Sequence, residues 1–218
     1  MNFNLSKTNG TAVTRLKAWT INKVAFKGVE LKTGTTSEGR VWKAMQFNFE
    51  GPDGIYNHMV FCPGDDGDKR VTGSTGGRDW ELPSAMEQLQ FTIAHVASAL
   101  APEAFEKLKG VELDLPKDFE KLVGIMQKAL AKAVDKETNL KLIGNNKGYA
   151  TVPSFININK TSKEAYISNN WLGDKVAFTP YETQKMKKAK ETTPTEVEKD
   201  EDSISENTES SDDIDFDI

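Results

Sequence analysis

The chain has 218 residues, 37% hydrophobic and 28% charged, with a formal net charge of −5, which suits one globular domain with a core and a further polar segment. Cys62 is the sole cysteine, which excludes an internal disulfide, and the polar N-terminus gives no indication of a signal peptide. No stretch reaches the length of a membrane span, so we expect a cytoplasmic protein without membrane contact.

The segment from Thr14 to Lys27 alternates in character and predicts the first strand. In a strand, side chains two residues apart share a face. One face is then largely apolar, and the other carries Arg15, Lys17, Trp19 and Lys23. A basic face with an exposed aromatic ring is typical of a surface that holds a phosphate backbone and stacks its bases. The alternative is an amphipathic strand whose lysines meet only water and whose tryptophan belongs to the core.

Two further strands are expected after this one. Glycines and small hydroxyl residues predict a turn at 33–39, and alternation predicts a strand at 40–50. The sequence Gly-Pro-Asp-Gly at 51–54 predicts a hairpin turn into a third strand at 55–62. Trp42 and Tyr56 lie on these two strands and are candidates for an exposed, base-stacking face.

Residues 63–78 are polar and rich in glycine, which predicts a loop. Its aspartates lack the closing glutamate of an EF-hand, and its glycines are not followed by the Gly-Lys-Ser/Thr of a phosphate loop. Two interpretations stay open. The segment is either a flexible connector or a mobile basic loop that closes over a bound strand with Lys69, Arg70, Arg78 and Trp80.

The hydrophobic period changes from two to that of a helix between residues 82 and 136. Ser84 and Glu87 have the spacing of a capping box, so a helix is expected to begin there. Pro102 ends this helix and opens a short one, and Pro116 starts a third. We expect the apolar stripes of these helices to belong to the core.

Period two returns at Asn139. The segment 139–158 predicts two strands around a turn at 144–148, and 165–178 predicts another short strand or two. Basic and aromatic candidates again lie close together in sequence here: Lys141, Lys147, Tyr149 and Phe155.

The last part of the chain has a different composition. The Lys-rich stretch from Lys185 is either a basic hinge or the end of a helix. Residues 191–218 hold 12 of the 33 acids and one of the 28 lysines and arginines, a net charge of −11, which leaves +6 on residues 1–190. This tail has too few apolar residues to order itself. Its tip, 212–218, alternates acids with Ile214, Phe216 and Ile218, which predicts a peptide that docks into an apolar, basic-rimmed pocket of a partner.

Three strands, a helical block and then further strands are the element order of an OB-fold barrel, which is partly open and binds oligonucleotides. We therefore expect a mainly β protein with an α insertion (α+β). Its five-stranded OB-fold barrel would occupy residues 1–182, with an enlarged helical connection at 82–138 between strands three and four. The disordered acidic tail would occupy 183–218.

At this point the chain resembles the single-stranded DNA-binding proteins of bacteriophage type. The resemblance rests on the tip DDIDFDI, on the order of elements, and on LKLIGNNKGYATVPSFI followed by DKVAFTPYE. The tip resembles the Asp-Asp-Ile-Pro-Phe tip of bacterial members, but it lacks the proline, and Ile218 follows the aromatic residue. The helical block is also larger than in bacterial members, so their tetramer is not assumed, and the oligomeric state stays open. A phage-encoded protein of this kind would act in the host cytoplasm.

The resemblance implies a function without catalysis, in which the protein coats and protects single-stranded DNA during replication, recombination and repair. Cations neutralise phosphates and release counterions, and exposed rings stack bases at about 1–3 kcal/mol each, so neither contribution depends on sequence. The candidates for stacking are Trp19, Trp42, Tyr56, Tyr149 and Phe155. The candidates for phosphate contact are Arg15, Lys17, Lys23, Lys69, Arg70, Arg78, Lys141 and Lys147.

The tail has two expected functions. Its negative charge would compete with DNA for the basic face. Its tip would recruit replication, recombination or repair proteins, and the residues proposed for this contact are Asp212, Asp213, Ile214, Asp215, Phe216, Asp217 and Ile218.

Two other function classes are weighed against DNA binding. A protein-binding adaptor or recombination mediator would use the same barrel and tail, with nucleic acid secondary. An enzyme is not expected, because two histidines and one cysteine make no zinc set, and neither a nucleophile elbow nor a phosphate loop is present. No metal or cofactor is expected either, although a magnesium nuclease built only on carboxylates leaves no sequence signature.

Overall fold

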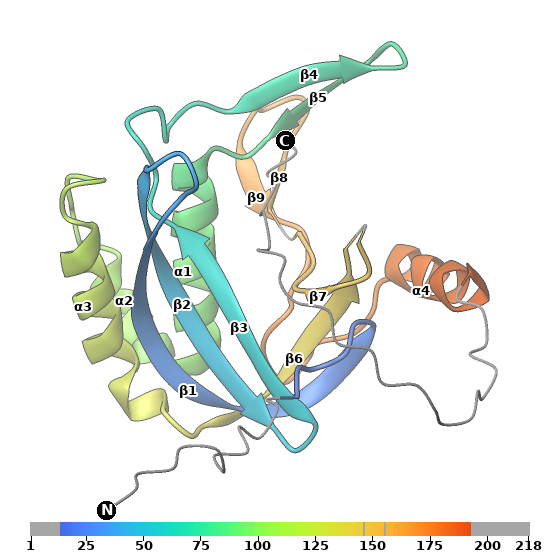
Figure 1. Cartoon of the computed structure of the whole chain (residues 1–218), viewed down its shortest axis with the longest axis horizontal. Coiled ribbons are helices and arrows are strands. Elements are labelled where there is room, and N and C mark those ends of the chain that lie inside the picture. The colour runs from blue at the N-terminus through green and yellow to red at the C-terminus, as the bar shows by residue number, and fades with distance from the viewer. Residues whose placement is uncertain (1–13, 146, 155, 193–218) are drawn as a thin grey trace, which may run out of the picture.

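The computed structural model describes residues 14–145, 147–154 and 156–192. Its main element is a curled, antiparallel, five-stranded sheet with the strand order β3-β2-β1-β6-β7 (Figure 1). The helical block enters between β3 and β6, so the predicted class, mainly β with a helical connection, is confirmed. The strands of this sheet are β1 (Thr20–Thr35), β2 (Val41–Gly51), β3 (Gly54–Phe61), β6 (Glu137–Gly144) and β7 (Ala150–Thr151).

The curl of the sheet comes from β1, which is long and has a different partner at each end. Its first part, from Thr20 to Ala25, pairs with β6, and its remainder pairs with β2. The register shifts between Phe26 and Gly28, and Gly28 has φ of +115°, a conformation that side chains with a Cβ rarely adopt. This bulge lets one strand serve both halves of the sheet.

Within β1 the predicted alternation holds, but the strand begins later than predicted. Val24 and Phe26 are buried as expected, and Val29 continues the core beyond the bulge. However, the strand starts at Thr20 and not at Thr14, because the chain turns at residues 18–19.

The core face of β2 carries Phe47 and Phe49, which are buried as their parity predicted. They pair with His58 and Tyr56 of β3, so these two polar rings share the core face. The more apolar parity of β3, which includes Met59, therefore lies on the outer face of the sheet. Tyr56, a predicted stacking candidate, is half-buried.

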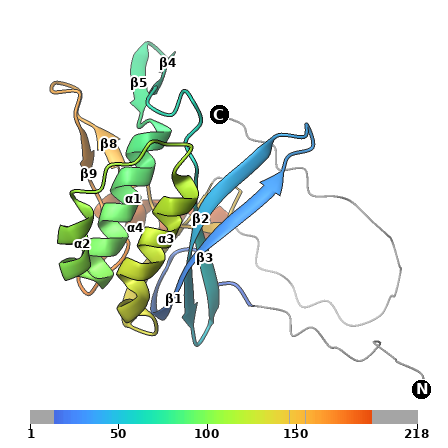
Figure 2. The same ribbon diagram turned by 90° about the vertical axis from the view of Figure 1, so that its left-hand side faces the viewer.

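A layer of helices covers the core face of the sheet on one side (Figure 2). The predicted capping box is confirmed, because Ser84 Oγ accepts the N–H of Glu87 at 3.1 Å and a Glu87 carboxylate oxygen accepts the N–H of Ser84 at 2.9 Å. The helices are α1 (Ala85–Leu100), α2 (Pro102–Leu108) and α3 (Phe119–Leu130), followed by a 3₁₀ turn, η1 (Ala131–Ala133). Of these, α1 and α3 supply core residues such as Val96 and Val123.

Two hairpins and one more helix complete the described part. The predicted loop is found at 63–70, whereas its second half belongs to a hairpin of β4 (Val71–Thr75) and β5 (Arg78–Leu82), which projects from the body (Figure 1). The second hairpin consists of β8 (Ile156–Ile158) and β9 (Ala165–Ile167). The helix α4 (Pro180–Thr192) crosses the boundary between body and tail that was predicted at residue 182. Within the described residues, no helix has both the length and the apolar character needed to cross a membrane.

One part of the core is built around a tryptophan between two histidines. Trp171 is fully buried, and its ring centroid lies 5.2 Å from that of His58 and 5.0 Å from that of His95. Burial lowers the pKa of His58 to about 4, helped by His95, and burial lowers the pKa of His95 to about 4 as well. Both imidazoles are therefore neutral in the folded protein at neutral pH.

Candidate nucleic-acid interface

The segment before β1 places two cations beside β3. The Leu16 N–H donates to the Ile55 carbonyl oxygen at 3.0 Å, and the Ile55 N–H donates to the Thr14 carbonyl oxygen at 2.9 Å. Leu16 is buried by this contact, whereas its neighbours Arg15 and Lys17 are exposed. The alternation predicted for a strand thus survives over these residues, although they bridge to β3 instead of forming the start of β1.

Trp19 marks the turn from this segment into β1. Its φ is +60°, an uncommon value for a bulky residue, and such conformations concentrate at functional sites. The indole is half-buried against Gly144 at the end of β6, and a Cβ on that glycine would lie 2.7 Å from the indole nitrogen. Glycine at 144 is therefore what allows Trp19 to sit against the end of β6.

The turn between β6 and β7 presents an exposed ring. Asn145 Oδ1 accepts the N–H groups of Lys147 at 3.0 Å and Tyr149 at 2.9 Å, and the Gly148 N–H donates to the Asn145 carbonyl oxygen. This tight turn leaves the Tyr149 side chain 69% exposed, and Lys147 is exposed beside it.

These two segments meet in a groove with a volume of about 630 Å³. Four of the predicted residues line it together: Arg15, Lys17, Tyr56 and Tyr149. The other lining residues are Leu16, Ala18, Gln46, Ile55, Asn57, Met59, Gly148 and Ala150, so no acidic side chain lines this groove within the described part of the chain. The Tyr56 hydroxyl is already engaged, because it accepts the Val152 N–H at 3.1 Å, and burial raises the pKa of Tyr56. The groove is thus cationic and aromatic, and Asn57 adds one exposed side-chain amide.

Trp42 lies farther along the outer face that Gln46 and Met59 share. Its indole packs over Gly34, where a Cβ would lie 2.4 Å from the ring, and it meets the Phe61 ring edge-on at 5.7 Å between centroids. Phe61 is 43% exposed. The pair forms a second aromatic surface on the outer face of β2 and β3, outside the groove itself.

Of the eight predicted cations, Arg15 and Lys17 are those found among the described residues that line the groove, and Lys147 is exposed at the turn beside it. Lys23 forms an exposed ion pair with Glu137 at 2.6 Å, and Lys69 pairs with Asp66. Arg78 lies in β5 opposite Thr75, next to the turn of the projecting hairpin.

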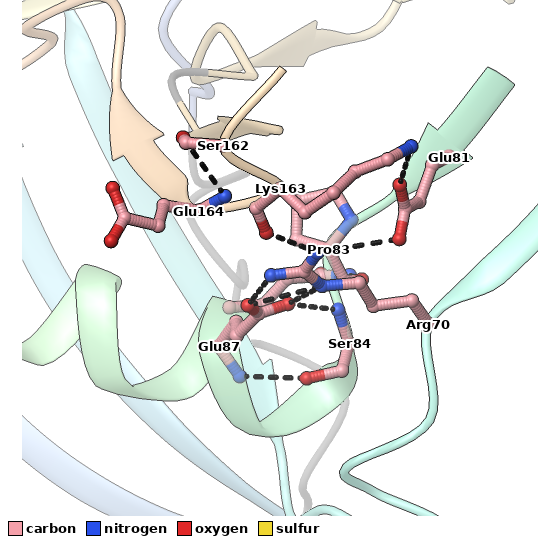
Figure 3. A network of polar contacts seen from close by, with 9 residues as sticks. Arg70, Glu81, Pro83, Ser84, Glu87, Ser162, Lys163 and Glu164 are labelled. Carbon is pink, nitrogen blue, oxygen red and sulfur yellow. Dashed lines mark hydrogen bonds and ion pairs between the residues drawn. The ribbon is translucent and has the colours of Figure 1, made fainter. Parts of the chain in front are cut away.

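Arg70 was predicted to contact phosphate, and its position corrects that prediction. Its guanidinium is the centre of a polar network (Figure 3). Nε donates to a Glu87 carboxylate oxygen at 2.9 Å, Nη1 donates to the Lys163 carbonyl oxygen at 2.7 Å, and Nη1 lies 3.3 Å from a Glu81 oxygen. The hydrogen bond to Glu87 raises the pKa of Arg70. Arg70 thus connects the base of the β4–β5 hairpin, the first turn of α1 and the β8–β9 turn.

Lys141 is the second correction. Its side chain is fully buried, and Nζ donates to Glu182 at 3.0 Å, to Asn169 Oδ1 at 2.6 Å and to the Ala177 carbonyl oxygen at 2.9 Å. All three hydrogens of the ammonium therefore have acceptors within the protein, and Lys141 has no capacity for a phosphate.

Phe155 and the tip at 212–218 lie outside the described residues. Gln46, Asn57 and Met59 line the groove but were not predicted as site residues. The one sequence signal for Gln46 was its parity, which it shares with Trp42.

Among the described residues, no group of three or more His, Cys, Asp or Glu is placed to hold a metal ion. Comparison of the chain with protein families, with curated proteins and with solved structures found no match. The interpretation of function therefore depends on the chemistry and geometry of the groove.

Proposed function

We propose that this protein binds single-stranded DNA without sequence specificity, in the groove formed by residues 15–18, β3 and the β6–β7 turn. The observation that carries the proposal is the meeting of Arg15, Lys17 and the exposed Tyr149 across an open groove to which no acid among the described residues contributes. Flexible cations beside an exposed ring suit a phosphate backbone with unpaired bases, because stacking needs a base face that a duplex does not offer.

The strand order supports an OB-type barrel for this function. In OB folds, the face of strands two and three and the loops after strands one and four bind oligonucleotides. Here β2 and β3 are the second and third strands of the main sheet, and the turn with Tyr149 joins its fourth and fifth strands. Residues of β2 and β3 and of the turn with Tyr149 line the groove, which supports this proposal.

In this proposal each part of the groove has a distinct task. Arg15 and Lys17 neutralise phosphates, and Tyr149 stacks one base. The exposed amide of Asn57 donates and accepts hydrogen bonds, so it tolerates several base edges or sugars, whereas Gln46 is buried and its amide donates to Asn48 Oδ1 at 2.6 Å. The bound DNA continues over Met59 toward the Trp42–Phe61 pair.

The acidic tail completes the proposal. Its net charge of −11 competes with DNA for the groove, and the tip at 212–218 recruits replication, recombination or repair proteins.

The proposal is tested by titrating the protein with oligo-dT at two salt concentrations and following tryptophan fluorescence. We expect quenching that weakens with salt, and Arg15→Gln/Lys17→Gln should reduce the magnitude of the slope of log K against log salt by about 1.4, about 0.7 for each lost phosphate contact. A chain lacking residues 212–218 should bind oligo-dT equally or more tightly. Absence of any binding by the intact protein would support the adaptor instead, and degradation of labelled strands in magnesium would support a nuclease.

A further inference from the structure

Another hollow, the helical pocket, lies between α1, α2, α3 and the segment 109–118 that joins α2 to α3. Its volume is about 260 Å³, just below the roughly 300–1,000 Å³ of small-molecule sites, so it suits one or two large side chains. Its lining is apolar except for Gln90 and Lys109, and Lys109 is the one charged residue that lines it within the described part of the chain. The helical pocket therefore offers an apolar group a place to leave water.

One wall of the helical pocket shows which kind of peptide packs there. Residues 111–115 read Val-Glu-Leu-Asp-Leu and belong to no helix or strand. The three apolar residues of this segment line the pocket, whereas Glu112 and Asp114 are exposed and do not line it. A segment that alternates apolar and acidic residues therefore already lies against the helices, with its apolar side chains at the pocket and its acids in solvent.

The end of the chain has the same pattern. Residues 214–218 read Ile-Asp-Phe-Asp-Ile and lie outside the described residues. In an extended peptide, side chains two residues apart share a face. Such a peptide can turn Ile214, Phe216 and Ile218 to an apolar surface while both acids stay in water, as residues 111–115 do.

The charges also favour the helical pocket for an acidic peptide. Lys109 is exposed, and its ion pair with Glu106 at 2.7 Å is a surface pair of the kind that contributes little, so its ammonium can turn to a carboxylate of the peptide. The hollow next to Trp42 carries two aspartates, Asp65 and Asp114, beside its two lysines, and these repel an acidic peptide. The helical pocket has no acid among its described lining residues.

The chain is long enough to bring its end to this pocket. The helix α4 ends at Thr192, and in Figure 1 it lies on the opposite side of the sheet from α2 and α3. Residues 193–213 span up to about 70 Å when extended, whereas a folded body of about 180 residues has a radius of gyration of about 16 Å. The end of the chain can therefore pass around the body to the helical pocket.

We propose that residues 214–218 dock into the helical pocket of their own chain, with Phe216 as the inserted side chain and Lys109 beside a carboxylate. Docking does not depend on DNA binding, so it goes beyond the proposed function. Docking within the chain and recruitment of a partner exclude one another, because both use the same apolar side chains. A partner protein therefore has to displace these residues from the pocket.

The test uses methionine methyl groups as NMR probes in the full chain, without nucleic acid. Met86 and Met126 line the helical pocket, Met59 lines the DNA groove, and Met45 is fully buried in the sheet. We expect the methyl signals of Met86 and Met126 to shift between the wild type and Phe216→Ser, and those of Met59 and Met45 to coincide. A synthetic peptide with the sequence of the tip should restore the wild-type signals in Phe216→Ser. It should do so at concentrations on the order of millimolar, because a flexible linker gives a tethered peptide an effective concentration of that order.

A matched pair of surface variants tests the pocket itself. Val111→Glu places an acid at the pocket, whereas Val134→Glu places one at a valine that does not line it, and the two valines are 40% and 44% exposed. Adding Phe216→Ser should shift the Met86 and Met126 signals in the Val134→Glu chain and leave them unchanged in the Val111→Glu chain. An unchanged urea midpoint shows that both valine variants are folded.

Three results would overturn the inference and leave the proposed function intact. Coincident Met86 and Met126 signals in the wild type and Phe216→Ser would show that the pocket does not hold the end of the chain. A shift at Met59 in their place would locate it in the DNA groove. A difference that fades on dilution would assign it to the pocket of a second copy. Conversely, a failure to bind oligo-dT would reject the proposed function and leave these signals as evidence of docking.

Discussion

The buried Lys141–Glu182 pair beneath α4 and the groove beside β3 both contain lysine, but the lysines have different functions in the two places. Lys141 is fully buried, with three protein acceptors within 3.0 Å, whereas Arg15 and Lys17 are exposed at a groove that no acid of the described residues lines. A cation whose acceptors come from its own chain stabilises the fold. A cation without them keeps its charge for a ligand, so burial and acceptors distinguish the two functions.

The aromatic residues of the two regions differ in the same way. Trp171 is fully buried and meets Phe49 and two histidines, while Tyr149 is 69% exposed at a turn. A ring that is surrounded by other rings contributes to packing. A ring held out by a tight turn offers a face for stacking with a ligand, which is the role that we assign to Tyr149.

The comparison is tested most strongly at Lys141. The variant Lys141→Met leaves the Glu182 carboxylate buried without its cation, and we expect a loss of about 3–5 kcal/mol in the free energy of unfolding, measured with urea. The matched control is Lys147→Met at the exposed turn, where we expect a change within about 0.5 kcal/mol. The double variant Lys141→Met/Glu182→Met should regain most of the loss, because it removes both charges. Equal losses of stability in Lys141→Met and Lys147→Met would contradict the structural role of the Lys141–Glu182 pair.

Acidification is expected to weaken the core around Trp171 while the exposed cations keep their charge. Because the folded-state pKa of His58 and of His95 is about 4, below the ordinary 6.5, the unfolded chain binds more protons between these values. The stability that these neutral imidazoles provide is present above pH 6.5 and is lost as the pH falls toward 4, by up to about 1.4 kcal/mol per pH unit for each histidine. Urea midpoints at pH 7.5, 6.5 and 5.5 measure this loss, and His58→Phe should reduce it. A flat profile in the wild type would reject the explanation.

Local signals in the sequence predicted much of the fold. The hairpin turn at 51–54 and the capping box at Ser84 are set by residues within a few positions of one another, and both are found. The β4–β5 hairpin was missed because its glycines and threonines lack an alternation of large apolar residues. The sequence did not decide between a hinge and a helix at α4, because this segment has no apolar stripe. The first turn of α4 is held by Lys141, which precedes Glu182 by 41 residues.

The candidate site was predicted only in part, for a related reason. Arg15, Lys17 and Tyr149 were identified from residue type and spacing, and the structure brings them together. The burial of Lys141 was not predictable, because its acceptors lie 28–41 residues away in sequence. Arg70 was misassigned likewise, since Glu87 is 17 residues away and Lys163 is 93.

The smallest expected effect is the loss of affinity for oligo-dT when one exposed tyrosine is replaced. This loss shows whether the ring contacts the ligand or is only exposed to solvent. Tyr149→Ala removes one stacking face and should weaken oligo-dT binding by about 1–3 kcal/mol, or between about five- and 150-fold, with little change in the urea midpoint. The matched control is Tyr166→Ala on β9, a tyrosine that is 47% exposed but does not line the groove. Tyr149→Phe should retain most of the affinity, because stacking needs the ring and not the hydroxyl. If both alanine variants weakened binding equally, exposure alone would account for the effect, and the position of Tyr149 at the groove would have no special role.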